Sequence, residues 1–308
     1  MSVLFFKPIA RPAIWGHTLV RDFFGYHDFP LGIGQSWSFS AQEGASTECV
    51  SEPYKGKTLL DLWTNHQELF GHPGEEFPVI ISLVGPEDDL SIQVHPDDEH
   101  AQKVGFPCGK NEAWYFIRSE EGSNIVYGHN AKDPADLQRY IDEDKWDDLI
   151  RHLDVHTDDF VYLPAGLLHA LRKGNVVYEI QQATDITYRF YDYHRKDEKG
   201  NERELHLEKA IDCLSYNPED MKNNVSPVIS EKENLKETVY ISNDSFTVTK
   251  LEVTGECEYV HDNYQLATVV IGNGTVDGTE IKVGDNFLIP KGVKVVFDGH
   301  MTIMMTTK

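Results

Sequence analysis

Short apolar runs that end at glycine or proline recur along the sequence, and they restrict the fold more than any other feature. They lie at residues 77–85, 113–117, 124–128, 160–166, 176–182, 187–193, 246–253, 265–272, 286–297 and 301–307. Runs of this length, rich in Val, Ile, Tyr and Phe, are typical of β-strands. Because strands outnumber helices and no glycine-rich phosphate loop follows any of them, we expect a mainly β sandwich or barrel and not a doubly wound sheet.

A few short helices are also predicted. Apolar residues recur at helical spacing in residues 56–71, 133–153 and 204–216. In the second stretch Asp133 is the expected N-cap, and Pro134 occupies the first turn. The acidic residues 97–99 follow a proline and indicate a solvated turn or a further helix start.

The sequence divides into two β-rich parts. Residues 217–238 are polar, include two prolines and predict a linker or long surface connection. We therefore expect a larger domain at 1–225 and a smaller one at 238–308.

The two domains share a sequence pattern, in which an Asp is followed by an apolar strand and then by Pro-x-Gly. The third residue after that glycine is His169 in the first domain and Val295 in the second. They look like copies of one β-unit, of which only the first would bind a metal.

The charge of the chain limits its partners. It has 51 acidic against 28 basic residues and a net charge of −23, which disfavours nucleic acid and anionic membranes. A local cationic cluster can still bind a small phosphate compound, because salt screens charges beyond about 8 Å. No segment is as long as a membrane span or a signal-peptide core, and the four cysteines are widely spaced. We expect a cytoplasmic protein with reduced thiols.

Residues 90–95, with the sequence LSIQVH, predict a strand with one apolar and one polar face. Side chains alternate along a strand, so Ser91, Gln93 and His95 would share the face opposite the apolar residues. This pattern suits a strand whose apolar face packs on a core while its polar face lines a cavity. An ordinary amphipathic strand would show the same pattern.

Further potential metal ligands lie in two other segments. Glu112 shares a strand face with Lys110, and His169 follows a Pro-x-Gly turn. Two imidazoles, one carboxylate and the amide oxygen of Gln93 would form a mixed nitrogen and oxygen set suited to Zn²⁺. Each residue alone has an ordinary interpretation, such as a histidine bonded to the backbone or a carboxylate paired with a lysine.

The surrounding motifs resemble the type I phosphomannose isomerases, in particular the short bacterial form. The resemblance covers nearly the whole chain and is carried, in order, by IWG, QSWSFSA, FPVIISLV, LSIQVHPDDEHA, GKNEAWYFI, LPAGLLHAL, YEIQQATDITYRFYDYHR and RELHLEKAID. It implies two cupin units, each a jelly roll or double-stranded β-helix. It also implies one Zn²⁺ per chain, with the ligands Gln93, His95, Glu112 and His169.

The resemblance further implies an aldose–ketose isomerase that interconverts mannose 6-phosphate and fructose 6-phosphate through an enediol. Arg189, four residues after Asp185, matches the active-site arginine of the family. It would stabilise the enediolate or grip the phosphate, and it is expected on the same strand face as Tyr191. Lys110 and Ser91 would contact the phosphate or a sugar hydroxyl.

The general base stays open. Asp185, Glu179 and a metal-bound hydroxide are all candidates, and Lys110 would serve only with a lowered pKa. Two other functions are also compatible with such a site. One is a sensor that binds a sugar phosphate without turnover, and the other is a metal-dependent oxygenase, for which a fourth protein ligand would leave little room. We expect a monomer or a weak homodimer.

Overall fold

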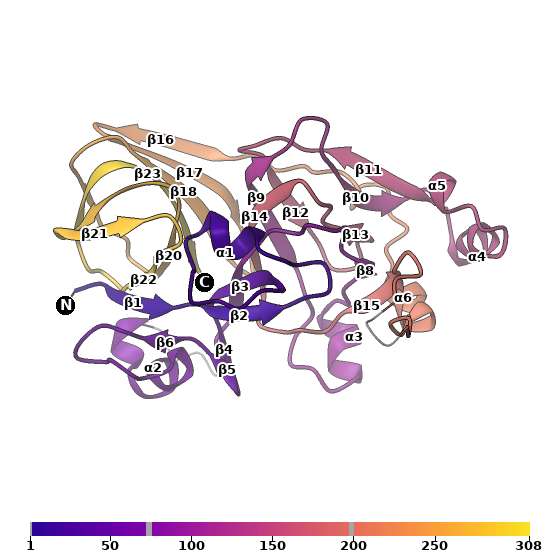
Figure 1. Cartoon of the computed structure of the whole chain (residues 1–308), viewed down its shortest axis with the longest axis horizontal. Helices are drawn as coiled ribbons and strands as arrows, with labels where there is room; N and C mark the ends of the chain where they lie inside the picture. Colours follow the sequence, from indigo (N-terminus) through magenta and orange to yellow (C-terminus); the bar gives the residue numbers. More distant parts are fainter. Residues whose placement is uncertain (1, 72–75, 197–199) are drawn as a thin grey trace.

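The computed structural model describes residues 2–71, 76–196 and 200–308. Within these residues the chain is mainly β, as predicted, and its paired strands run antiparallel. Figure 1 shows two β-rich halves, with the C-terminal strands in orange and yellow at one end and the helices α4 and α5 at the other. All four cysteines are described and are free thiols.

Two sheets form the larger half. One sheet contains, in spatial order, β12 (Phe160–Leu163), β9 (Glu112–Ser119), β14 (Asn175–Gln182), β7 (Val79–Val84), β3 (Ile33–Phe39) and β2 (Ile9–Pro12). The other contains β11 (Ile150–Asp154), β10 (Asn124–His129), β13 (His169–Ala170), β8 (Ile92–Val94) and β15 (Tyr188–Tyr191). One buried cluster combines side chains of both sheets, among them Trp114, Val177, Ile125 and Tyr127. The two sheets therefore pack against a shared core.

The C-terminal half is built on a third sheet. Its main path contains β16 (Val228–Lys232), β17 (Leu235–Ser242), β18 (Thr247–Val253), β23 (Val295–Thr307), β20 (Gln265–Val276), β22 (Asn286–Ile289), β1 (Leu4–Lys7) and β6 (Glu48–Cys49). Two further strands pair at its sides, β19 (Cys257–Tyr259) and β21 (Thr279–Lys282), while a separate small hairpin is formed by β4 (Ala41–Gln42) and β5 (Ala45–Ser46).

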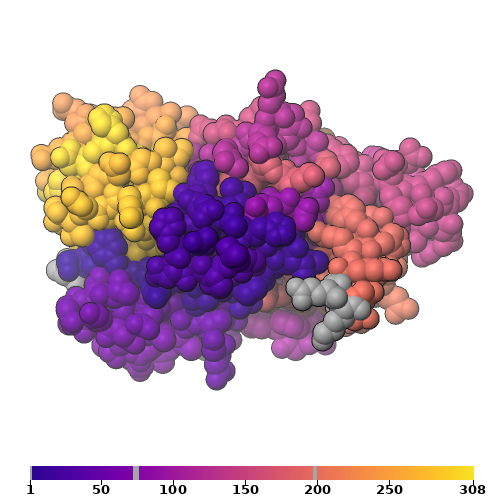
Figure 2. All heavy atoms as spheres, in the orientation of Figure 1, coloured from indigo at the N-terminus to yellow at the C-terminus, as the bar shows by residue number. Residues whose placement is uncertain are grey.

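The N-terminal segment connects the two halves. Strand β1 pairs with β22 in the C-terminal sheet, whereas β2 pairs with β3 in the six-stranded sheet. Figure 2 shows this segment in indigo, between the yellow C-terminal residues and the magenta and orange residues of the larger half. The division into 1–225 and 238–308 stays a prediction, and β1 and β6 lie in the sheet of the second half although they precede residue 225.

The helices are short. They are α1 (Leu19–Phe23), α2 (Leu59–Asn65), the 3₁₀ turn η1 (Gln67–Leu69), α3 (Asp98–Lys103), α4 (Pro134–Asp142), α5 (Trp146–Leu149) and α6 (Leu207–Cys213). The side chain of Asp133 accepts the backbone N–H of Asp136 at 2.8 Å, so the predicted cap is confirmed. Asp97 caps α3 in the same way. Among the described residues, we find no helix with the length and apolar character needed to cross a bilayer.

Two local predictions were wrong in part. The helix expected over 133–153 breaks near Asp144, which has a φ of 54°, and the backbone is extended again from Ile150 into β11. The expected linker at 217–238 contains β16 and the start of β17, which form a hairpin. Every residue of β16 is exposed. The strand has no buried apolar face, so its sequence lacks the alternation by which strands are predicted.

The internal sequence echo corresponds to two similar strand–turn–strand units. β12 leads through a turn into β13, and β22 leads through a turn into β23. Gly166 and Gly292 lie at the same place in these turns with φ of 85° and 66°, a conformation that favours glycine. The residue three positions later begins the next strand in both units. His169 faces the site described below, whereas Val295 is buried in an apolar core.

Aromatic side chains from distant segments pack between the halves. Trp63 makes edge contacts with Phe70, Phe77 and Tyr264, at centroid distances between 4.9 and 6.1 Å. These contacts bury the ring of Trp63.

Replacing Trp63 by alanine is expected to lower the free energy of unfolding by about 3–5 kcal/mol, because the substitution removes a large buried ring. Urea unfolding monitored by circular dichroism would measure this, and a loss below about 1 kcal/mol, typical of a surface substitution, would contradict it.

Candidate active site

Strand β8 has the two faces that the sequence predicted. Ile92 and Val94 are buried in an apolar core, whereas Gln93 lines a cavity on the opposite side of the strand. Gln93 pairs with His169 on β13 and with Arg189 on β15. The sheet register therefore brings three of the predicted site residues side by side.

Three of the four predicted metal ligands converge. His95, Glu112 and His169 are each no more than 2% exposed, and their ligand atoms all lie within 4.8 Å of one another. His95 Nε2 lies 3.4 Å from Glu112 Oε1, and His169 Nε2 lies 3.2 Å from Glu112 Oε2. His95 and His169 come from or adjoin the five-stranded sheet, while Glu112 begins β9 of the six-stranded sheet. The group therefore joins the two sheets.

The backbone orients both imidazole rings. Nδ1 of His95 lies 2.9 Å from the carbonyl of Ile186, and Nδ1 of His169 lies 2.9 Å from the carbonyl of Leu167. A carbonyl only accepts hydrogen bonds, so we assign the ring proton to Nδ1 in both residues. Each Nε2 then directs a lone pair toward Glu112. Burial lowers the pKa of His95 well below its ordinary value, and the charge of Lys110 lowers it further.

This arrangement fits a divalent cation. His95 Nε2, His169 Nε2 and Glu112 Oε2 are buried and make no hydrogen bond, which is costly for polar atoms in a protein interior. Two lone pairs and a carboxylate that face one another attract a cation. Imidazoles held by carbonyl groups through Nδ1 are typical of metal sites. Gln93 lies on the wall of the same cavity, and its role as a fourth ligand stays a prediction.

Lys110 is buried beside the metal-ligand candidates. Its Nζ lies 3.1 Å from Glu112 Oε1. Burial acts to lower the pKa of Lys110, but the charges of Glu112, Glu179 and Asp185 outweigh it and raise the pKa above its ordinary value. These surroundings favour the charged ammonium form of Lys110, and its place among the candidate bases stays a prediction. For Glu112, burial raises the pKa, but Lys110 and the histidines lower it more.

Glu179 is a buried carboxylate on the wall of this cavity. It lies on β14 and accepts hydrogen bonds from Trp114 Nε1 and Gln35 Nε2, both at 3.0 Å. Burial raises its pKa to about 7, and the charge of Glu112 acts in the same direction. A carboxylate with a pKa near neutrality can take and return a proton at physiological pH.

The other predicted residues lie nearer to solvent. The side chain of Asp185 is 64% exposed, and its Oδ2 lies 4.0 Å from Arg11 Nη2. Arg189 donates from Nη1 to the carbonyl of Glu204 at 2.7 Å, while its buried Nε has no partner. Ser91 is buried on the cavity wall. Glu179 is thus buried and accepts two hydrogen bonds, whereas Asp185 is largely exposed, and the identity of the base stays a prediction.

The cavity of about 390 Å³ is lined by most of the predicted site residues and by seven residues that were not predicted. The predicted residues are Ser91, Gln93, Lys110, Glu112, Glu179, Asp185 and Arg189, and the others are Trp15, Gln35, Val84, Leu90, Gln181, Thr187 and Arg203. All seven belong to the sequence motifs that carry the family resemblance, and Arg203 is the first residue of RELHLEKAID.

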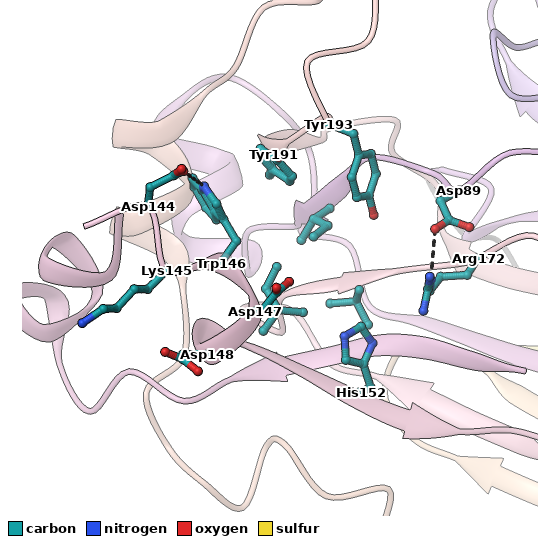
Figure 3. A pocket seen from close by; sticks show the side chains of 13 residues that line it. Asp89, Asp144, Lys145, Trp146, Asp147, Asp148, His152, Arg172, Tyr191 and Tyr193 are labelled. Atoms are coloured by element: carbon teal, nitrogen blue, oxygen red, sulfur yellow. Dashed lines mark hydrogen bonds and ion pairs between the residues drawn. The ribbon is translucent and has the colours of Figure 1, made fainter. Parts of the chain in front are cut away.

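The expectation that Arg189 and Tyr191 share a strand face was wrong. The pairing register shifts between them, so Arg189 lies opposite Gln93 and Tyr191 lies opposite Ile92. Such a β-bulge reverses the side on which the following residue points. Tyr191 therefore lines a separate cavity of about 610 Å³, which Figure 3 shows with Trp146, Tyr193 and the Asp89–Arg172 pair.

Comparisons with known proteins agree with this geometry. Residues 4–125 match the family described as phosphomannose isomerase type I, catalytic domain. The mannose-6-phosphate isomerase ManA of Bacillus subtilis is 37% identical over 297 residues, which cover 94% of this chain and 93% of that protein. The mannose-6-phosphate isomerase of Streptococcus mutans is 35% identical over 308 residues, which cover 98% and 96%.

The crystal structure of the mannose 6-phosphate isomerase from Bacillus subtilis has the same fold. It superimposes with a TM-score of 0.95 at 34% sequence identity, and the match covers 100% of each chain. This likeness confirms the mainly β, cupin-type fold that the sequence predicted. Since relatives more than 30% identical align over almost the whole length, the chain belongs to the type I phosphomannose isomerase family.

Proposed function

We propose that the protein interconverts mannose 6-phosphate and fructose 6-phosphate, with one Zn²⁺ bound by Gln93, His95, Glu112 and His169. The observation that carries this proposal is the set of three buried ligand atoms without hydrogen bonds. They adjoin a cavity that also contains a carboxylate with a pKa of about 7. The names of the relatives supply the sugar phosphate.

The reaction moves a proton between C2 and C1 of the open-chain sugar. We assign this transfer to Glu179, which would remove the proton from C2 of the aldose and return it to C1 of the enediol. A proton also passes between the two oxygens, so that the carbonyl moves from C1 to C2. Trp114 and Gln35 each donate a hydrogen bond to Glu179 and hold the carboxylate in place.

Negative charge on the substrate oxygens must be stabilised as the enediol forms. A bound Zn²⁺ would supply Lewis acidity at these oxygens. The Lys110 ammonium lies in the same wall and would donate hydrogen bonds to a sugar oxygen. Arg189, with a buried Nε that lacks a partner, would bind the enediolate or the phosphate, and Ser91 would donate to the same group.

A coupled assay of fructose 6-phosphate tests the proposal. The purified protein is expected to turn over mannose 6-phosphate with zinc present and to lose activity on treatment with a chelator. Turnover should return when zinc is added back. No turnover in the zinc-loaded protein, with tight binding of the sugar phosphate, would favour the sensor. Iron in the purified protein and activity only in the presence of oxygen would favour the oxygenase.

Arg189→Ala is expected to retain the metal and to lower kcat/KM by about 10²-fold or more, the scale for removal of a charge-stabilising donor. The metal should stay bound because, among the described residues, Arg189 forms no hydrogen bond or ion pair with the three converging ligand atoms. Metal analysis and steady-state kinetics on the same preparation would measure both. A variant with the full rate would remove Arg189 from the mechanism.

A further inference from the structure

We propose that Arg203, held by the buried carboxylate of Asp192, is a second cation for the substrate phosphate and selects phosphorylated over free sugars. This inference rests on the proposed isomerase function and deepens it. Arg203 and Arg189 line the same cavity. Arg203 is the first residue of the motif RELHLEKAID, to which the sequence assigned no site residue. Asp192 would be a positioning residue, since it acts through Arg203.

Asp192 makes a close and nearly saturated set of hydrogen bonds. Its side chain is 4% exposed. Arg203 donates from Nε to Oδ2 at 2.7 Å and from Nη2 to Oδ1 at 2.6 Å. Arg195 donates to Oδ1 from Nε and Nη2, at 3.1 and 2.5 Å. The two bonds from Arg203 form a bidentate pair, which fixes the plane of the guanidinium as well as its position.

The two arginines that share Asp192 reach different places. Arg195 donates from Nη1 to the carbonyl of Asp89 at 2.5 Å and lies over the ring of Tyr193. Asp89 and Tyr193 both line the second cavity (Figure 3). Arg203 instead lines the substrate cavity. Among the described residues, the hydrogen bonds of Arg203 to Asp192 use Nε and one N–H of Nη2, and the Nη1 group and the other N–H of Nη2 can donate to another acceptor.

Two arginines, Arg189 and Arg203, line this cavity, although the chain as a whole carries −23. Burial and the charge of Arg203 both lower the pKa of Arg189, with Asp192 and Glu204 acting in the opposite direction. Two arginines on one cavity wall, one of them with a partnerless buried Nε, match the geometry and charge of a phosphate group. A free sugar would leave these donors without an acceptor, which disfavours its binding.

Arg203→Gln tests the proposal through a split between KM and kcat. The KM for mannose 6-phosphate is expected to rise about 10-fold or more, as for loss of one charged hydrogen bond of about 1.5–3 kcal/mol, while kcat changes little. The inhibition constant of inorganic phosphate, measured as a competitor, should rise by a similar factor. Arg203→Lys should restore part of the affinity for the sugar phosphate and for inorganic phosphate, because lysine retains the positive charge but lacks the paired donors of the guanidinium. Asp192→Asn should also raise KM more than it lowers kcat.

Arg172→Gln is the matched control. Arg172 also pairs with an aspartate, donating from Nε to Asp89 Oδ2 at 3.0 Å, but it lines the second cavity and not the substrate cavity. It should leave the KM and the phosphate inhibition constant unchanged. If Arg203→Gln leaves both constants unchanged in an enzyme that is active as the wild type, or lowers kcat alone, the inference is wrong while the proposed function stands.

Absence of turnover in the wild type would overturn the proposed function instead. The phosphate site can then be tested on its own, by calorimetric titration of the wild type, Arg203→Gln and Arg172→Gln with inorganic phosphate. Weaker binding only in Arg203→Gln would support the phosphate site. Equal binding by all three proteins, or no binding by any, would overturn it.

Discussion

Replacing His169 by alanine is expected to abolish both stoichiometric zinc binding and isomerase turnover. The substitution removes one of three buried ligand atoms that face one another within 4.8 Å. The other two, on His95 and Glu112, would remain without an anchored third donor. Zinc sites are built from Cys, His, Asp and Glu ligands in fixed geometry, so His95 and Glu112 with only the neutral amide of Gln93 would hold the ion weakly. Metal analysis after dialysis and the coupled assay would measure the two effects together.

His156→Ala is the control for this experiment. His156 is 80% exposed, and its Nδ1 lies 3.5 Å from Asp159 at the surface. It should change neither the metal content nor the rate. Equal effects of the two substitutions would mean that the metal site lies elsewhere. Since His169 is buried, the thermal unfolding of the metal-free wild type and the metal-free variant should be compared, to separate loss of the ligand from loss of the fold.

Glu179→Gln is expected to retain zinc and to lower kcat/KM by about 10²–10⁴-fold, the range for loss of a general base. Glutamine has nearly the shape of glutamate and its oxygen can still accept from Trp114, but it cannot take up a proton. Asp185→Asn is the matched control, because it makes the same change in the rival carboxylate, which is 64% exposed. A large loss in Asp185→Asn with little loss in Glu179→Gln would reverse the assignment.

The pH dependence gives a second measure of Glu179. The base acts only when ionised, so kcat/KM of the wild type should fall as the pH drops through the pKa of Glu179. Burial and Glu112 raise that pKa to about 7 in the cation-free protein. A bound divalent cation favours the carboxylate and moves the midpoint to lower pH. The acidic limb should disappear in Glu179→Gln, and its persistence there would assign it to another group.

The faces of the site strands could be predicted from the sequence, because alternation along a strand is a local property. Residues 90–95 show this, since Gln93 faces the cavity while Ile92 and Val94 are buried in the core. Which strands meet is not a local property. The prediction that His95, Glu112 and His169 converge rested on the resemblance to a family. Local sequence patterns could not give it, because Glu112 comes from another sheet.

Features set by pairing or by distant partners could not be predicted. The bulge that separates Arg189 from Tyr191 arises from the register with β8, and no residue in the run marks it. The choice between Glu179 and Asp185 depends on Gln35 and Trp114, which lie on β3 and β9. Both carboxylates look alike in the sequence, and only the structure shows that Glu179 is buried while Asp185 is largely exposed.

Arg203 was missed for a related reason. It lies in a charged stretch without apolar periodicity, where an arginine is most often a solvated surface residue. Its place in the cavity follows from the bonds to Asp192, eleven residues earlier in the chain. A bidentate pair of this kind leaves no recognisable spacing in a sequence.

The pairing of β1 with β22 has a consequence for how the protein forms on the ribosome. Leu4–Lys7 leaves the ribosome long before its partner Asn286–Ile289, which lies far downstream in the chain. Until then one edge of this strand has no native partner, and its apolar residues lack their contacts with the later residues, such as that of Phe5 with Phe287. Long-range pairings of this kind form slowly, so the nascent chain remains vulnerable to aggregation until residues 286–289 have emerged.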